Sequence, residues 1–195
     1  MFPPRFAPIL QEMEPLAALF REAGHRLFLV GGSVRDLLLG DTDAGTDLDL
    51  IDFDATTTAT PDQIKKIVQP IADALWTQGE RFGTIGLKIG ERTYEITTHR
   101  AEAYSPDSRK PEVQFATDIE TDLSRRDFTI NAMALELTTD TPVLVDPFGG
   151  LADLMARVLR TPLSAEESFN DDPLRMLRAA RFISQLEVAP DPSIT

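Results

Sequence analysis

Hydrophobic residues recur at helical spacing near the start of the chain, and a strand-like run follows them. Between residues 8 and 24 six apolar side chains fall on one helix face, and Gly24 is a natural stop. They are Ile9, Leu10, Met13, Leu16, Leu19 and Phe20. The apolar run at 27–31 predicts a strand that ends in glycines. Residues 33–39 then predict a short helix with Ser33 as its N-cap.

Alternation of polar and apolar residues replaces the helical spacing after a loop at 40–46. Residues 47–54 alternate aspartates with apolar side chains, which predicts a half-buried strand. The later elements are predicted in this order: a helix over 61–75 with Thr60 as N-cap, strands over 83–89 and 92–98, a mobile loop over 101–112, a helix over 119–135, a strand over 142–146, and helices over 151–157 and 165–186.

Strands therefore come early and helices late, which predicts an α+β fold. We expect a small mixed or antiparallel sheet flanked by helices, followed by the start of an all-helical unit. The boundaries we predict are an N-terminal helix over 1–24, the sheet domain over 25–150 and the first part of the helical unit over 151–195. Since the last apolar helix stops soon after it begins, we expect the chain to be a fragment of a longer protein.

Composition narrows the function classes. The 195 residues carry a net charge of −13, two histidines and no cysteine, which excludes disulfides and cysteine zinc sites. The acidic balance argues against a general nucleic-acid coat, whereas a few basic clusters fit a small charged substrate held with metal. No segment reaches the length of a membrane span, so we expect a cytosolic protein with no membrane partner.

The glycine pair at the end of the first strand is the first candidate site. Without side chains, Gly31 and Gly32 let the backbone approach a phosphate closely. Arg35, one turn into the following helix, can reach a phosphate held there. The alternative is an ordinary strand-to-helix turn.

Aspartates that alternate along the next strand form the second candidate site. Two carboxylates on one strand face suit two divalent cations, and hence phosphoryl transfer. Glu95, on a later strand, would be a third carboxylate if the two strands are neighbours. One alternative is a solvated acidic loop. Another is a calcium loop over 41–47, which fails the EF-hand template because its fifth and sixth positions are wrong.

Two basic segments complete the candidates. Arg126, Asp127 and Asn131 offer charge and hydrogen bonds to a sugar or triphosphate, the alternative being a basic helix start. Asp172 and Arg175 are three residues apart, and on one helix they would share a face. They could read a base edge, with Asp accepting and Arg donating, or simply form an intrahelical ion pair.

Taken in order, seven segments between residues 27 and 182 resemble the family of class II tRNA nucleotidyltransferases and bacterial poly(A) polymerases. The segments are LVGGSVRDLLLG, DFDATTTATPDQI, YEITTHR, SRKPEVQF, RRDFTINAMAL, DPFGG and DDPLRMLRAARF. The resemblance implies a nucleotidyltransferase head followed by a helical neck, body and tail. It implies template-independent addition of C, C and A to tRNA 3′ ends from CTP and ATP, by two-metal nucleotidyl transfer with Mg²⁺.

The resemblance also assigns roles to residues. It implies that the triphosphate lies on Gly31, Gly32, Ser33 and Arg35. It implies that Asp52 and Asp54 hold two Mg²⁺, with Glu95 in support, and that the ribose meets Arg126, Asp127 and Asn131. The base would be read by Asp172 and Arg175, with Arg178 as a further nucleotide ligand. The segment 103–112 resembles the family's flexible loop, which helps to switch from C to A addition.

The position of the metal pair needs a choice between Asp47/Asp49 and Asp52/Asp54. We favour the second pair, because Pro61 then follows Asp52 at the family's usual interval and the extra residues fall in a loop, where insertions are tolerated. Two rival functions remain open. One is a poly(A) polymerase, or an enzyme that adds only CC or only A; the other is a truncated fragment that binds NTP or RNA with little catalysis.

Overall fold

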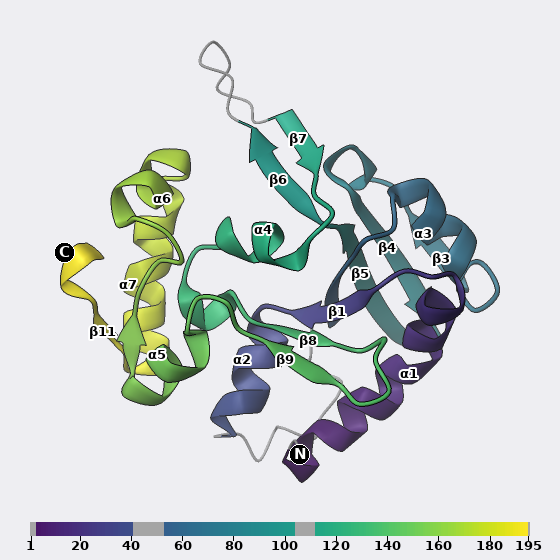
Figure 1. The fold of residues 1–195 in the computed structure, drawn as a ribbon, viewed down its shortest axis with the longest axis horizontal. Coiled ribbons are helices and arrows are strands. Elements are labelled where there is room, and N and C mark those ends of the chain that lie inside the picture. Colours follow the sequence, from purple (N-terminus) through teal and green to yellow (C-terminus); the bar gives the residue numbers. More distant parts are fainter. Residues whose placement is uncertain (1–2, 41–52, 104–111, 195) are drawn as a thin grey trace.

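A mixed seven-stranded sheet forms the centre of the molecule in this computed structural model, which describes residues 3–40, 53–103 and 112–194 (Figure 1). The strand order is β3-β4-β5-β2-β1-β8-β9. β2 and β5 pair in parallel and the other neighbours are antiparallel. The strands are β1 (Leu27–Val30), β2 (Phe53–Thr57), β3 (Ala74–Trp76), β4 (Thr84–Ile89), β5 (Arg92–Thr98), β8 (Ala134–Glu136) and β9 (Val143–Val145). The predicted α+β fold is confirmed.

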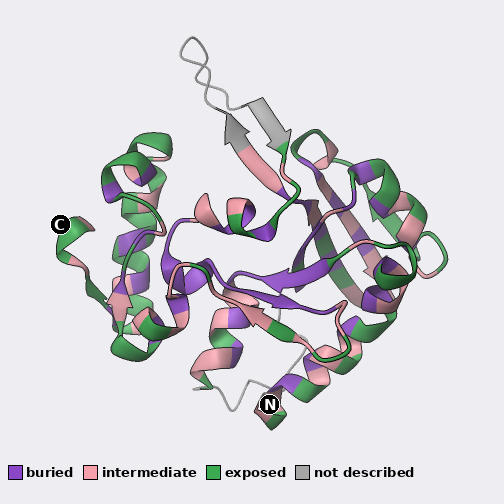
Figure 2. Ribbon diagram, in the orientation of Figure 1, coloured by how far each residue is buried: buried purple, intermediate pink, exposed green. Residues whose placement is uncertain are grey.

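Three helices pack on one face of the sheet and bury its apolar side chains. They are α1 (Ala7–Glu22), which follows the short 3-10 helix η1 (Pro4–Phe6), α2 (Gly32–Leu39) and α3 (Pro61–Val68). Their apolar sides pack with alternate residues of the strands into the main core, so that Phe53 and Ala55 point inward while the intervening Asp54 is exposed. Figure 2 shows the burial concentrated along the central strands. The face on which Asp54 lies is called the open face below.

The glycine turn between β1 and α2 (Gly32–Leu39) differs in one detail from the expectation. Gly31 is the N-cap of α2, with φ 75° and ψ −139°, and no side chain caps the helix. The prediction of Ser33 as N-cap is therefore wrong, because the helix begins one residue earlier at Gly32. Gly40, in the left-handed region with φ 67°, ends the helix.

The helix predicted over 61–75 is shorter than expected. Thr60 does cap α3, in a capping box with Gln63, but the helix ends at Val68 and β3 follows. Pro70 lacks the N–H that a continued helix needs. After the 3-10 helix η3 (Glu80–Phe82), the two strands predicted over 83–89 and 92–98 are confirmed as β4 and β5.

The segment between residues 99 and 136 departs most from the prediction. The expected mobile loop over 101–112 begins and ends as the hairpin strands β6 (Arg100–Ala103) and β7 (Glu112–Phe115), and residues 104–111 lie outside the described part. The single helix expected over 119–135 is wrong. It divides into α4 (Ile119–Ser124), the 3-10 helix η4 (Thr129–Asn131) and β8. Tertiary bonds override the helical pattern, since the Thr129 N–H donates to the Arg160 carbonyl at 2.8 Å and β8 pairs with β1.

The C-terminal helices lie on the opposite side of the molecule from α1 (Figure 1). The helix predicted over 151–157 is α5 (Gly150–Ala156). The one expected over 165–186 is wrong, because Asp172 is extended and Pro173 follows it, which divides it into α6 (Ala165–Asp171) and α7 (Leu174–Leu186). The tail adds β11 (Ala189–Pro190), paired with β10 (Val158–Leu159), and the 3-10 helix η5 (Pro192–Ile194). Within the described ranges no helix is long and apolar enough to cross a membrane.

Candidate functional site

Side chains from three separate elements form one continuous chain of hydrogen bonds. Arg35 of α2 donates from Nη1 to Asn131 Oδ1 at 2.6 Å, and Asn131 Nδ2 donates to Asp127 Oδ1 at 3.0 Å. Arg178 of α7 donates from Nε to Asp127 Oδ2 at 2.7 Å, and its Nη2 lies 2.6 Å from the same oxygen in an ion pair. Asp127 and Asn131 are buried, with 7% and 6% exposure. Four of the residues predicted to bind a nucleotide are thus in direct contact. We call them the Arg35–Arg178 network.

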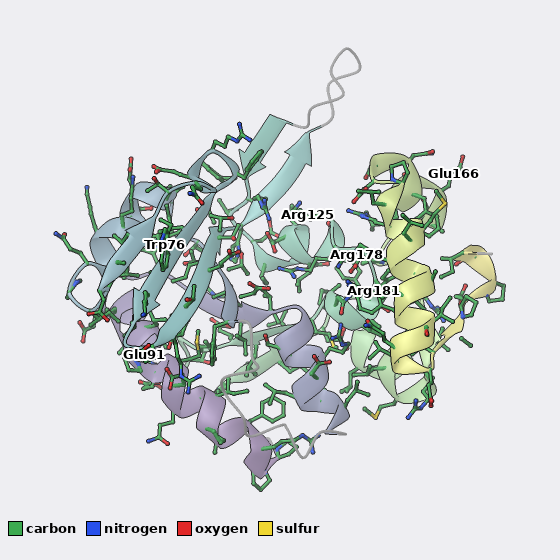
Figure 3. The ribbon with its side chains drawn as sticks, turned by 180° about the vertical axis from the view of Figure 1, so that it is seen from behind. Trp76, Glu91, Arg125, Glu166, Arg178 and Arg181 are labelled. Atoms are coloured by element: carbon green, nitrogen blue, oxygen red, sulfur yellow. The ribbon has the colours of Figure 1, made fainter. Side chains whose placement is uncertain are left out.

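An aromatic ring holds the helix of this network in place. Phe182, on the buried side of α7, meets Phe128 edge-on at 5.8 Å between ring centroids. Arg35, Arg178 and Arg181 each lie within 6 Å of the Phe182 ring centre, at 5.4, 5.7 and 4.9 Å. Figure 3 shows Arg178 and Arg181 on the side of α7 that is turned toward the rest of the molecule. The pattern of apolar residues in α7 gave no sign that one of them anchors three arginines.

A second arginine lies over the glycine turn. A Cβ added at Gly31 would come within 3.3 Å of Arg126 Nη1. Arg126 Nη2 donates to the buried Asp122 carboxylate at 3.4 Å, while its buried Nε has no hydrogen-bond partner among the described residues. The first backbone N–H groups of α2 are directed at this turn, as at any helix start. The turn thus combines backbone donors with guanidinium groups, which is the chemistry that binds phosphate.

The two strands that carry the candidate metal ligands are neighbours. Asp54 on β2 and Glu95 on β5 are aligned partners in a parallel pair, so both carboxylates lie on the open face, and both are exposed. Asp52, Asp47 and Asp49 lie outside the described residues, as does the alternative calcium loop over 41–47. Within the described part of the chain no group of three or more metal-ligating side chains occurs. Among the described residues, the candidate metal site therefore consists of the carboxylates of Asp54 and Glu95, the ligand type that Mg²⁺ prefers.

The side chain of Arg175 forms its hydrogen bonds outside the Arg35–Arg178 network. Its Nη1 donates to Ser168 Oγ at 2.8 Å and its Nη2 to the carbonyl of Arg125 at 2.6 Å, beside a pocket of about 210 Å³ between α4 and α6. Asp172 precedes α7, and its Oδ1 accepts from the Leu174 N–H at 3.0 Å. The prediction that Asp172 and Arg175 share one helix face is therefore wrong, because Pro173 separates Asp172 from the helix.

A buried histidine contacts β2, and the sequence pattern did not single it out. His99 is fully buried, and its Nδ1 lies 2.8 Å from the hydroxyl of Thr56, two residues after Asp54 on β2. Burial lowers the pKa of His99 to about 4, although the Asp122 carboxylate partly opposes the shift. The imidazole is therefore neutral near pH 7. The histidine in the YEITTHR segment was the one available signal.

The glycine turn, the paired carboxylates and the arginine-rich network define a nucleotidyltransferase type of head domain. Residues 27–160 match the family described as "Poly A polymerase head domain", and the chain belongs to that family. A similar curated protein is the CCA-adding enzyme of Bacillus subtilis (strain 168). It is 44% identical over 173 residues, which cover 88% of this chain and 40% of that protein.

Solved structures agree with this membership. The Bacillus stearothermophilus CCA-adding enzyme in complex with CTP superposes with a TM-score of 0.78 and 33% identity, covering 99% of this chain and 42% of that one. The Thermotoga maritima CCA-adding enzyme complexed with tRNA superposes with a TM-score of 0.74 and 31% identity, covering 95% of this chain and 40% of that one. The chain thus spans about two fifths of the length of the proteins that it matches.

Proposed function

We propose that this chain is the catalytic head and the start of the neck of an enzyme that adds C, C and A to tRNA 3′ ends, with CTP and ATP as substrates. The observation that carries the proposal is the Arg35–Arg178 network, because it connects the glycine turn of the head with α7, the proposed neck helix. Relatives named CCA-adding enzymes, one solved with CTP and one with tRNA, support it.

Asp52 and Asp54 would hold two Mg²⁺, and Glu95 would support them from the neighbouring strand. The donor set fits, since Asp54 and Glu95 are aligned and exposed on the open face. When bound, the metal ions lower the pKa of the primer 3′-hydroxyl and neutralise charge on the leaving pyrophosphate. Histidine is not required as a general base.

The chain's own residues would position the nucleotide. Gly31, Gly32 and Ser33 present backbone N–H groups to the triphosphate, and the guanidinium groups of Arg35 and Arg126 balance its charge. Asp127 and Asn131 are the ribose ligands of this proposal. Because the network fixes both side chains in buried positions, they can orient a sugar without a further loss of side-chain freedom.

Base selection would fall to Asp172, Arg175 and Arg178. Arg175 would first exchange its bonds to Ser168 and the Arg125 carbonyl for the base edge.

The test compares two double variants of the chain in Mg²⁺-dependent incorporation of CTP and ATP into a tRNA that lacks its 3′ CCA. We expect Asp52→Ala/Asp54→Ala to abolish incorporation and the matched control Asp47→Ala/Asp49→Ala to retain it. The reverse result would transfer the metal site to the first pair. Incubation with single nucleotides separates the rivals: ATP alone extended into a long tail would indicate a poly(A) polymerase, and nucleotide binding without extension would indicate a binding fragment.

A further inference from the structure

Four neighbouring strands place a tryptophan in the same cross-strand row as the candidate metal ligands. Trp76 on β3 is paired with Gly86 on β4, Gly86 with Glu95 on β5, and Glu95 with Asp54 on β2. Since directly paired residues point to the same side of a sheet, all four lie on the open face. At about 4.8 Å per strand spacing, the tryptophan is about 14 Å from Asp54 across the sheet.

The indole of Trp76 lies over the glycine beside it. A Cβ added at Gly86 would be 3.2 Å from Trp76 Cε3 and 3.6 Å from Trp76 Cβ, so the ring occupies the space that a side chain would fill. Trp76 nevertheless remains 40% exposed. Figure 3 shows it on the strands at the opposite end of the molecule from α7. Covering a glycine near a sheet edge would explain the contact, but not the exposure of so large an apolar ring.

The surroundings of Trp76 are polar and suit a nucleic acid better than an apolar protein surface. Thr84, Thr93 and Thr97 alternate with the core residues of β4 and β5, so their side chains lie on the open face. Lys88 shares this face, as the partner of Ala74 and Thr93, and its Nζ lies 3.7 Å from the Glu91 carboxylate, an exposed ion pair with which a backbone phosphate would compete. An exposed ring beside hydroxyl groups and a cation is a surface on which a base of single-stranded RNA can stack, and the exposed carboxylates of Glu95 and Asp54 lie further along the same row, where the proposed metal ions would bind.

We propose that Trp76 is a stacking platform for a base near the 3′ end of the single-stranded RNA whose terminal hydroxyl is extended at Asp54. The identity of the RNA rests on the proposed function, but the stacking does not. Stacking tolerates any base, which suits a primer whose last residues change with each addition. The RNA would follow the row of paired residues from Trp76 past Gly86 to Glu95 and Asp54.

The experiment uses the fact that Trp76 is the only tryptophan of the chain. A short single-stranded RNA ending as a tRNA lacking CCA is titrated into the 195-residue chain, and tryptophan fluorescence is recorded. We expect quenching that saturates. We also expect Trp76→Ala to weaken binding of the same RNA, measured by anisotropy of a labelled copy, about tenfold, and Trp76→Phe to stay within about threefold of wild type.

Two controls separate stacking from folding. Thermal unfolding of each variant shows whether the fold is retained, and Trp76→Phe keeps a ring on Gly86 if the alanine variant does not fold. Gly86→Val leaves the tryptophan in the chain but places a branched side chain beneath its ring, so quenching should fall.

Extension of the same RNA is measured separately. Extension without quenching, together with unchanged binding by Trp76→Ala, overturns the platform and leaves the proposed function standing. Quenching without extension supports the platform and contradicts the proposed function. Absence of both RNA binding and quenching overturns the platform, and a protein partner would then be the occupant to seek.

Discussion

Arg178 forms an ion pair with one oxygen of Asp127, Oδ2, to which its Nε donates at 2.7 Å while its Nη2 lies 2.6 Å away. The other oxygen accepts from the Phe128 N–H at 2.8 Å and from Asn131 Nδ2 at 3.0 Å. An ionised carboxylate has about four acceptor positions; three of those of Asp127 accept hydrogen bonds, and Nη2 of Arg178 lies against Oδ2 beside the remaining one. A ribose hydroxyl that donates to Asp127 would therefore replace one of the Arg178 donors and release this guanidinium toward the nucleotide.

Arg178→Ala tests this relationship. It removes one charge-assisted hydrogen bond and the accompanying ion pair to a buried carboxylate, and because the arginine is half exposed we expect the free energy of unfolding to fall by only about 1 kcal/mol. If Arg178 contacts the bound nucleotide, the KM for NTP rises about tenfold as well. Arg181→Ala is the matched control, since it removes a contact with the same Phe182 ring. Equal effects of the two variants on KM would argue against a specific role for Arg178.

Gly31→Ala should disturb the glycine turn more than its backbone strain alone predicts. Gly31 has a φ of 75° and a ψ of −139°, a conformation that costs an alanine about 1–3 kcal/mol, and the new Cβ would be 3.3 Å from Arg126 Nη1. Gly24→Ala is the control, because Gly24 has the same φ of 75° with nothing within 4 Å of the added Cβ. Chemical denaturation measures the loss of stability in each variant, and we expect weaker NTP binding for Gly31→Ala alone. Equal NTP affinity in the two variants would show that Arg126 has no part in the turn.

Gly150→Ala should displace the segment that carries Asn131. The added Cβ would lie 2.1 Å from the Thr129 carbonyl oxygen and 2.9 Å from Met133 Cγ, so α5 must move away from η4. Overpacking of this kind costs about 1–3 kcal/mol or more of the free energy of unfolding. The adjacent Gly149→Ala meets nothing within 4 Å, although its φ of 73° adds strain. Thermal unfolding should therefore show a larger loss at Gly150 than at Gly149, and the reverse order would contradict the packing argument.

Local patterns predicted those elements whose hydrogen bonds are local. The periodicity of α1, the Thr60 N-cap of α3 and the β4–β5 hairpin could be read directly, because each depends on neighbouring residues. The same patterns failed where distant contacts decide the backbone. β8 resembles a helix in sequence until its pairing with β1 is known, and the apolar pattern over 165–186 continues across Pro173, where the helix breaks.

In the candidate site, too, the sequence predicted which residues take part but not how they contact one another. Motif residues such as Arg35, Asp127 and Asn131 could be named from the sequence, whereas their mutual bonds depend on how α2, η4 and α7 pack. Trp76 carries no motif, and its place in one row with Asp54 follows from strand order alone. A sequence pattern specifies which face a side chain occupies, but not which strand lies beside it.

His99 should make the stability of the protein depend on pH below neutrality. Its pKa is about 4 in the fold and about 6.5 in an unfolded chain, so between these values the unfolded state binds a proton that the native state does not. The charged and titratable groups that act on the ring are Asp118, Asp122, Arg26 and Arg126. The stabilisation is complete above about pH 6.5 and is lost as the pH falls toward 4, by an amount on the order of 3 kcal/mol.

Denaturant unfolding of wild type and His99→Phe between pH 4 and 7 measures this pH dependence of the free energy of unfolding. The phenylalanine can pack on Phe28, whose ring centre is 5.5 Å from that of His99, but it loses the contact with Thr56. We expect His99→Phe to be less stable than wild type at pH 7, with a flatter slope below pH 6.5. His25→Phe removes the other histidine and is the control for the loss of an imidazole elsewhere in the chain. Parallel slopes for wild type and His99→Phe would mean that His99 does not resist protonation in the fold.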